Sequence, residues 1–103
     1  MVNWSKPAKF DLKQIHDYIV RDSKFYAKKI SLEIVEKSEK LNLFPDVGRI
    51  VPEMGDPRIR ELLIYSYRLI YEVFPEKVEV LALIHSKRNF INDLLNEQRH
   101  EKD

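Results

Sequence analysis

The 103-residue chain contains no cysteine, so it can form neither a disulfide framework nor a thiolate metal site. It also lacks any apolar run approaching the roughly 20 residues that cross a bilayer, because charged residues interrupt every candidate. The first residues do not show the basic and then apolar regions of a signal peptide. We therefore expect a protein of the reducing cytoplasm that does not enter a membrane.

A clear excess of one charge is missing as well. The net charge is +1, from 18 Lys and Arg against 17 Asp and Glu. Proteins that hold nucleic acid mainly through phosphate contacts usually carry a basic excess. Between Pro45 and Phe90, seven basic residues face seven acidic ones, and 7 − 7 is zero. Any basic patch must therefore arise from three-dimensional sorting, which weakens an RNA-binding interpretation.

Two helical patterns fill the N-terminal half. After a short strand at Val2–Trp4, Ser5 is a suitable helix N-cap. Apolar residues then recur every three or four positions to about Arg21, and Ser23 can cap a second such run that ends at Pro45. We expect an antiparallel helix hairpin whose apolar stripes need a sheet to cover them.

Beyond the second helix the apolar period changes to two. The segment Pro45–Pro57 holds three prolines and both glycines, so it predicts a loop. Strands follow at Ile59–Tyr65, Tyr67–Phe74 and Val78–His85, with a hairpin turn between the last two. Alternation along the last strand puts four residues on one face: Val78, Val80, Ala82 and Ile84.

The pattern closes with helical spacing at Phe90–Arg99. The fold class is therefore α+β, with an N-terminal strand, an antiparallel helix hairpin packed on a small antiparallel sheet, and a short C-terminal helix. No repeat, linker or change of composition divides the chain, and its length suits one core. We expect a single domain spanning residues 1–103.

Arg68 is the first candidate for a functional role. Strand alternation places it on the face opposite Tyr67, beside an apolar residue. A guanidinium in such a place is either paired with a carboxylate or exposed to bind one from a ligand. The paired alternative would use Glu72 on the same face or Glu61 across the strands.

His85 is the second candidate. It ends an apolar strand close to Lys87 and Arg88, and neighbouring cations favour the neutral imidazole, which can act as a general base on a ribose 2′-hydroxyl. Alternatively, it bonds only to the backbone at the strand end. Glu53 could complete an acid–base set with Arg68 and His85, unless its loop is simply a rigid connection. The three histidines lack metal-ligand spacing, so we expect no metal or other cofactor.

Three sequence motifs, in order and spacing, resemble those of the RelE/ParE superfamily of toxins. They are Gly-Arg-x-Val-Pro-Glu at 48–53, Tyr-Arg-Leu-Ile-Tyr at 67–71, and Ile-His-x-x-Arg at 84–88. The resemblance extends over Asn3–Gln98. It implies the toxin of a type II toxin–antitoxin pair, of the plasmid stabilisation type, and a cognate antitoxin that wraps it and masks its active surface.

Members of this superfamily attack different targets. RelE-like toxins cut mRNA in the ribosomal A site, whereas ParE-like toxins poison DNA gyrase. The resemblance matches Arg68 and Arg88 to the two RelE-like arginines. It puts Ile59 and Glu61 at the lysine positions and Leu94 at the late tyrosine. A glutamate at a lysine position, as at Glu61, would oppose the negative charge that develops on a phosphorane.

Another nuclease branch uses a glutamate, an arginine and a histidine, which Glu53, Arg68 and His85 match. It also has a C-terminal tyrosine, and no tyrosine follows Tyr71 here. ParE-like members lack the nuclease set and share the extended helix hairpin and the Ile-His-x-x-Arg ending. The resemblance therefore favours a ParE-like gyrase inhibitor, which need not be an enzyme, over a ribosome-dependent mRNA endoribonuclease.

The two interpretations give the same side chains different roles. In an endoribonuclease the catalytic residues would be Glu53, Arg68, His85 and Arg88, and the partners would be the ribosome and mRNA beside the antitoxin. In a gyrase inhibitor they would belong to a binding surface. The residues predicted to contact the target or the antitoxin are Arg49, Arg60, Tyr67, Arg68, Lys87 and Arg88.

Overall fold

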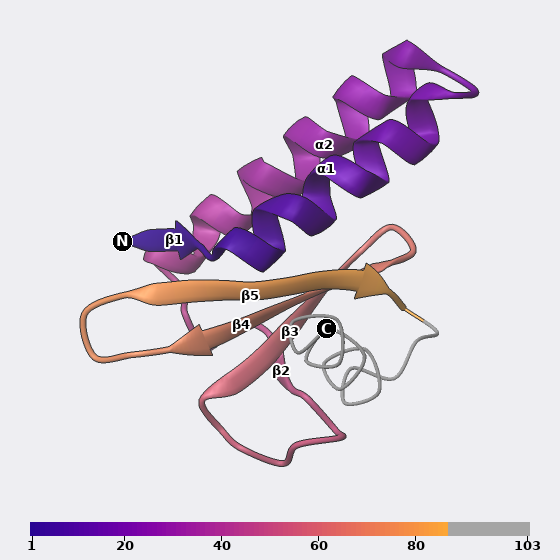
Figure 1. The fold of residues 1–103 in the computed structure, drawn as a ribbon. Helices are drawn as coiled ribbons and strands as arrows, with labels where there is room; N and C mark the ends of the chain where they lie inside the picture. The colour runs from indigo at the N-terminus through magenta and orange to yellow at the C-terminus, as the bar shows by residue number, and fades with distance from the viewer. Residues whose placement is uncertain (87–103) are drawn as a thin grey trace.

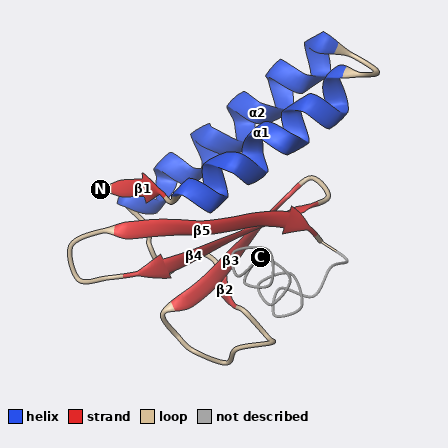
Figure 2. Cartoon of the chain, in the orientation of Figure 1, coloured by secondary structure: helices blue, strands red, loops and turns tan. Residues whose placement is uncertain are grey.

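The computed structural model describes residues 1–86, so the helix expected at Phe90–Arg99 lies outside the described residues (Figure 1). A helix hairpin covers one face of a sheet, which gives two layers (Figure 2). The elements in chain order are β1 (Val2–Trp4), α1 (Lys6–Val20), α2 (Lys24–Glu39), the 3₁₀ turn η1 (Lys40–Asn42), β2 (Arg49–Ile50), β3 (Ile59–Ile64), β4 (Tyr67–Val73) and β5 (Val78–His85).

Both helices begin at the serines that the sequence indicates. The Ser5 hydroxyl accepts the backbone N–H of Ala8 at 3.2 Å, and the Ser23 hydroxyl accepts that of Tyr26 at 3.1 Å. Each bond satisfies one of the N–H groups that a helix start leaves without an intrahelical partner. The predicted hairpin is therefore confirmed.

The sheet has five strands in the order β1-β5-β4-β3-β2. The antiparallel meander of β3, β4 and β5 is confirmed, and β1 extends it by running parallel to β5. The prediction of an uninterrupted loop at Pro45–Pro57 is wrong at β2, where Arg49 pairs with Glu61 and Ile50 with Arg60. Two residues are too few to show a period, so the sequence pattern concealed this strand.

A β-bulge in β5 changes which residues face the helices. Ile70 pairs with Ala82 but Tyr71 pairs with Val80, so Leu81 is an extra residue on β5. An extra residue moves all following side chains to the other face of the sheet. The expectation that one face carries Val78, Val80, Ala82 and Ile84 is therefore wrong: the first two face the helices and the last two face away.

The sheet consequently has an apolar cluster on each side. The cluster under the helices consists of Ala8, Ile34, Leu41, Ile64, Leu69, Tyr71, Val78, Val80 and Leu83. The cluster on the other face consists of Val51, Ile59, Ile70, Ala82 and Ile84. Burying an aliphatic side chain stabilises a fold by about 1.5–3 kcal/mol, so both faces contribute to stability. Polar side chains next to the second cluster are therefore held in an apolar setting.

The turn between β3 and β4 consists of Tyr65 and Ser66. Tyr65 has φ +55°, a left-handed conformation that costs free energy for any residue with a Cβ atom. Its hydroxyl donates a hydrogen bond to the Glu33 carboxylate on α2, and the Ser66 carbonyl accepts the N–H of Ser86 at 2.7 Å. The turn is thus fastened both to the helix layer and to the end of β5.

Candidate functional site

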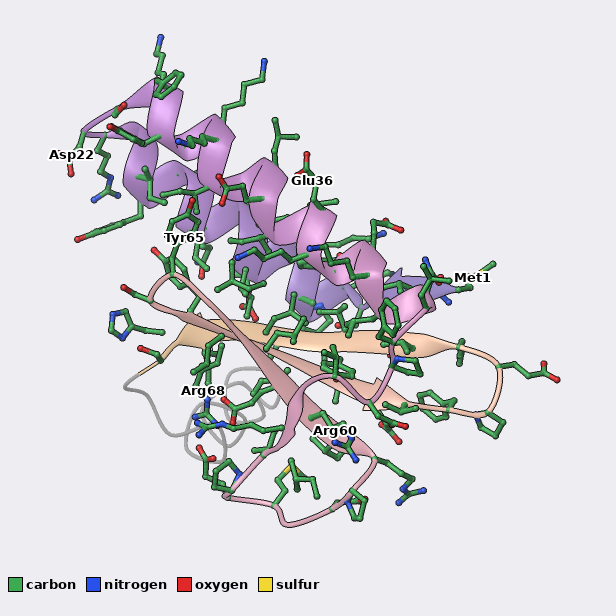
Figure 3. All side chains as sticks on the ribbon, turned by 180° about the vertical axis from the view of Figure 1, so that it is seen from behind. Met1, Asp22, Glu36, Arg60, Tyr65 and Arg68 are labelled. Atoms are coloured by element: carbon green, nitrogen blue, oxygen red, sulfur yellow. The ribbon has the colours of Figure 1, made fainter. Side chains whose placement is uncertain are left out.

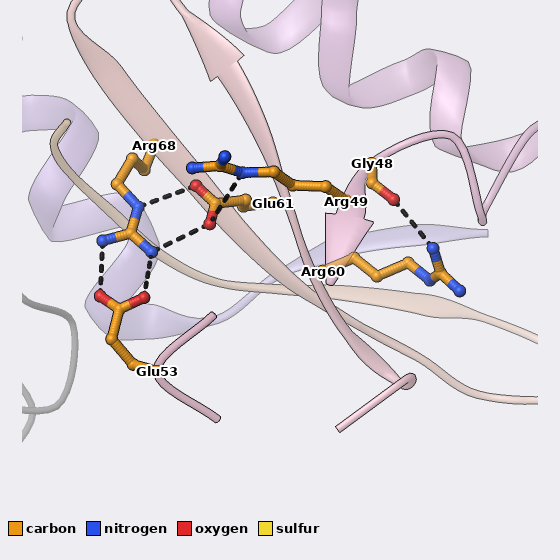
Figure 4. A network of polar contacts seen from close by, with 6 residues as sticks. All are labelled: Gly48, Arg49, Glu53, Arg60, Glu61 and Arg68. Atoms are coloured by element: carbon orange, nitrogen blue, oxygen red, sulfur yellow. Dashed lines mark hydrogen bonds and ion pairs between the residues drawn. The ribbon is translucent and has the colours of Figure 1, made fainter. Parts of the chain in front are cut away.

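Arg68 points away from the helices and is only 5% exposed. Figure 3 shows Arg68 on the far side of the sheet from Tyr65 and the helix hairpin. The guanidinium donates to both oxygens of Glu61, at 2.8 and 2.9 Å, and to both oxygens of Glu53, at 2.7 and 2.8 Å (Figure 4). Two bidentate pairs of this kind are strong and directional. Of the two alternatives for Arg68, the carboxylate-paired one is realised.

The two carboxylates reach Arg68 from different elements. Glu61 comes from β3 and its side chain is fully buried, whereas Glu53 comes from the β2–β3 connection and its side chain is 17% exposed. The Nε of Arg49 on β2 approaches Glu61 at 3.5 Å. Two arginines and two glutamates therefore form a network of zero formal charge, which we call the Arg68 network.

The Arg68 network fixes the charge state of its central residue. The hydrogen bonds that Arg68 donates to Glu53, and then those to Glu61, raise the pKa of Arg68 above its ordinary value and outweigh the opposing effect of burial. The guanidinium is positive at every physiological pH. Its charge is balanced by two carboxylates, so the network offers little net attraction to an incoming phosphate.

Arg60 has a structural role on the other face of the sheet, where it pairs in register with Tyr71. Its Nε donates to the Pro57 carbonyl at 3.0 Å, and one Nη donates to the Gly48 carbonyl at 2.9 Å (Figure 4). The same Nη reaches the Asp46 carbonyl at 3.3 Å, and the Asp46 carboxylate lies 3.7 Å from Nε. Arg60 therefore ties Pro57, near the end of the β2–β3 connection, to Asp46 and Gly48, which precede β2.

The backbone of Gly48 lies directly against Tyr71 and the backbone of Glu61. Its N–H donates to the hydroxyl of buried Tyr71 at 2.9 Å, and that hydroxyl donates to the Pro45 carbonyl at 2.8 Å. A Cβ at position 48 would come within 2.5 Å of the Glu61 carbonyl oxygen, so only glycine fits. Burial, the largest cause, raises the pKa of Tyr71. The chain entering β2 is thus locked onto the sheet.

His85 lies on the other side of the sheet from Arg68. It ends β5, is exposed, and pairs in register with Tyr67, whereas Arg68 pairs with Ile84. The rings of His85 and Tyr67 meet edge to face, with centroids 6.2 Å apart. The structure therefore brings Glu53 to Arg68 but directs His85 to the opposite face. Lys87 and Arg88 lie outside the described residues.

A second surface is an open groove of about 690 Å³ beside β1 and the helix hairpin. Its lining is apolar at Val2, Trp4, Leu12 and Val35, and polar or charged at Asn3, Lys9, Lys13, His16, Ser31 and Glu39. The Trp4 indole N–H donates to Ser38 at 3.2 Å, which fixes the groove wall. An apolar groove that also carries charged side chains suits an amphipathic segment of a partner protein.

Sequence reasoning missed two exposed tyrosines, Tyr18 on α1 and Tyr65 in the β3–β4 turn. The available signal was the Tyr65-Ser66 dipeptide between two strands, since such turns usually carry glycine, asparagine or aspartate. Within residues 1–86 no group of three His, Cys, Asp or Glu side chains could hold a metal ion. No helix in the same range is long and apolar enough to cross a membrane.

The helix hairpin and the sheet order give the small α+β fold that the sequence motifs predicted. The family model for the ParE toxin of the type II toxin–antitoxin system parDE matches residues 2–90. The chain therefore belongs to the ParE toxin family.

Comparison with solved structures agrees with this fold. The chain is similar to a chain from the chromosomal ParDE toxin–antitoxin system of P. aeruginosa, with a TM-score of 0.70 and 24% sequence identity. The match covers 84% of this chain and 95% of the other. No curated protein matches the sequence. The family assignment implies an antitoxin partner.

Proposed function

We propose that this toxin inhibits DNA gyrase by binding to the enzyme, and that its cognate antitoxin neutralises it by direct binding. One observation carries the proposal: the guanidinium of Arg68 is held by Glu53 and Glu61 in two bidentate pairs. A side chain in this state holds the β2–β3 connection in place and is not available to bind a reacting phosphate. The toxin would then act through its surface, in the cytoplasm, where gyrase acts on DNA.

The chemistry of RNA cleavage argues in the same direction. A ribonuclease must stabilise the extra negative charge of a phosphorane with donors aimed at it. Here the candidate arginine, Arg68, already bonds to two carboxylates. The fully buried one, Glu61, occupies a position where a RelE-like nuclease has a lysine. Cleavage would require Arg68 to leave at least one glutamate, and His85 lies across the sheet from it.

The proposal is tested in bacterial cells that express the toxin from a controlled promoter, with and without the antitoxin. Gyrase poisoning predicts growth arrest, induction of a DNA-damage reporter and gyrase-linked DNA breaks, all suppressed by the antitoxin. An endoribonuclease predicts cleaved mRNA on ribosomes without DNA breaks. Growth arrest with mRNA cleavage and an unresponsive damage reporter would reject the gyrase proposal.

A further inference from the structure

The Arg68 guanidinium uses two different edges for its two carboxylates. Its Nε and Nη2 donate to Glu61 at 2.8 and 2.9 Å, whereas Nη1 and Nη2 donate to Glu53 at 2.7 and 2.8 Å (Figure 4). The Nη1–Nη2 edge is the end of the fork, with which an arginine binds both oxygens of a carboxylate or phosphate ligand. Here Glu53 fills that position, so the chain supplies its own oxyanion.

The two glutamates differ in their access to solvent. Glu61 lies on β3, and its side chain is fully buried. Glu53 lies in the β2–β3 connection, and its side chain is 17% exposed. Solvent therefore reaches the Glu53 side chain but not that of Glu61. Of the two carboxylates, Glu53 is the one that an oxyanion from solution can replace.

The β2–β3 connection has further contacts in which the Glu53 side chain takes no part. Val51 is fully buried in the outer apolar cluster. Its N–H donates to the Ile59 carbonyl at 3.0 Å, and its carbonyl accepts the N–H of Gly55 at 3.0 Å. Because these bonds join backbone groups, rotation of the Glu53 side chain would open the end of the guanidinium fork and leave them in place.

A second guanidinium adds to the positive charge at this place. The Oε1 atom of Glu61 accepts a hydrogen bond from Arg68 at 2.9 Å and lies 3.5 Å from the Nε of Arg49. Two arginines thus approach one carboxylate oxygen. Without Glu53, the three remaining side chains carry a formal charge of +1, which attracts an anion in a setting that is partly shielded from water.

We propose that Glu53 is an autoinhibitory counter-ion. It closes a site in which Arg68, with Arg49 beside it, would otherwise bind an oxyanion. The ligand class is a group that presents two oxygens to the end of the fork, such as a carboxylate or a phosphate. This inference goes beyond the proposed function and does not depend on gyrase as the target, so either can fail without the other.

The test compares Glu53→Ala, which vacates the position, with wild type and with Asp56→Asn. Asp56→Asn is the matched control, because it changes the charge of the same connection equally and removes the carboxylate 3.2 Å from Arg58, whose side chain is 70% exposed. Glu53→Gln, which keeps the length of the side chain and loses its charge, replaces Glu53→Ala if the alanine variant does not fold.

Inorganic phosphate, or acetate in a separate series, replaces chloride at constant ionic strength. The Arg68 Nε–H resonance in ¹H–¹⁵N NMR spectra reports binding at the site itself. The urea midpoint reports it a second time, because a ligand that binds only the folded protein stabilises it. Wild type and Asp56→Asn give the general effect of each salt on stability.

Glu53→Ala should show a saturable shift of the Arg68 resonance and a larger rise in the urea midpoint than the other two proteins. If Glu53 occupies the site in about 90% or more of wild-type molecules, half-saturation of Glu53→Ala should need about tenfold less anion than wild type. Saturation by phosphate or by acetate supports the proposal and shows which oxyanion the site takes.

Three results would overturn the proposal. The first is a folded Glu53 variant that shows no saturable shift with either anion. The second is half-saturation at the same concentration in that variant and in wild type, because Glu53 would then not be closing the site. The third is an equal rise in the urea midpoint of Asp56→Asn, because any arginine deprived of its carboxylate would then respond alike.

Discussion

Removal of the Arg68 guanidinium should be the most damaging single change on the outer face of the sheet. In Arg68→Met the fully buried Glu61 carboxylate would lose its two hydrogen bonds from Arg68. Within residues 1–86 it would keep the ion pair with Arg49 at 3.5 Å, but the Arg49 side chain is 61% exposed. Leaving one charge of a buried pair without its partner costs about 3–5 kcal/mol. A domain of this kind has a total stability of about 5–15 kcal/mol, so this single change would remove a large share of it.

The double variant Arg68→Met with Glu61→Leu separates an uncompensated charge from lost packing. It removes both buried charges, and the remaining Glu53 is partly exposed and sits in a connection rather than a strand. Replacing a buried ion pair by apolar side chains is often neutral, so the double variant should recover about 2 kcal/mol or more of the single-variant loss. The free energy of unfolding in urea, followed by circular dichroism, gives both values.

Arg58→Ala is the control for this series. Arg58 pairs with Asp56 at 3.2 Å but is 70% exposed, so its removal should leave the free energy of unfolding unchanged. The reasoning is refuted if Arg68→Met unfolds with the same free energy as wild type. It is equally refuted if the double variant is less stable than the single one, because the carboxylate would then not be the source of the loss.

Three further changes test other contacts by urea unfolding. Gly48→Ala should cost about 3 kcal/mol, since its Cβ would meet the Glu61 carbonyl at 2.5 Å and the Tyr71 hydroxyl at 2.6 Å; an unchanged midpoint would contradict this. Burial raises the pKa of Tyr71, so its hydroxyl loses the proton at lower pH in the unfolded chain than in the folded protein. The free energy of unfolding should therefore fall as pH rises through about 10. This fall should be flatter in Tyr71→Phe, and an equally steep fall in both proteins would argue against it. Tyr65→Gly should raise the urea midpoint by relieving the φ of +55°, whereas a lower midpoint would show that the Glu33 contact outweighs the strain.

The elements with a strong local signal were predictable from the sequence. Ser5 and Ser23 mark the helix starts because their hydroxyls accept backbone N–H groups, which is a purely local interaction. The three longer strands were recognised from their alternation. The family motifs gave the toxin class, and the match over residues 2–90 confirms it.

Features that depend on distant residues were not predictable. The bulge at Leu81 is tied to α1, where the Ser5 hydroxyl donates to the Leu81 carbonyl at 3.3 Å and the Asp11 carboxylate accepts the Leu83 N–H at 3.0 Å. No periodicity in β5 records these partners, so the inverted face at Ala82 was missed. The two-residue strand β2 was missed for the same reason, because it exists through its pairing with β3.

The site was predictable in its parts and less so in its geometry. The alternatives for Arg68 included an ion pair with Glu61, which the structure contains, but a second bidentate pair with Glu53 could not be read from residues 15 positions apart. Proximity of Glu53 to Arg68 was expected, whereas His85 was grouped with them because strand alternation alone does not fix where a bulge changes the face. Which of these side chains contact a target or the antitoxin stays a prediction.

A supercoiling assay with purified gyrase and toxin freed from its antitoxin tests the central claim most directly. The gel should score lost supercoiling and linear DNA together, and the same toxin preparation should be added to translating ribosomes to score mRNA cleavage. The account predicts inhibited supercoiling with accumulating linear DNA, and intact mRNA. Cleaved mRNA together with unimpaired supercoiling by folded toxin would contradict it and return Arg68 to a catalytic role.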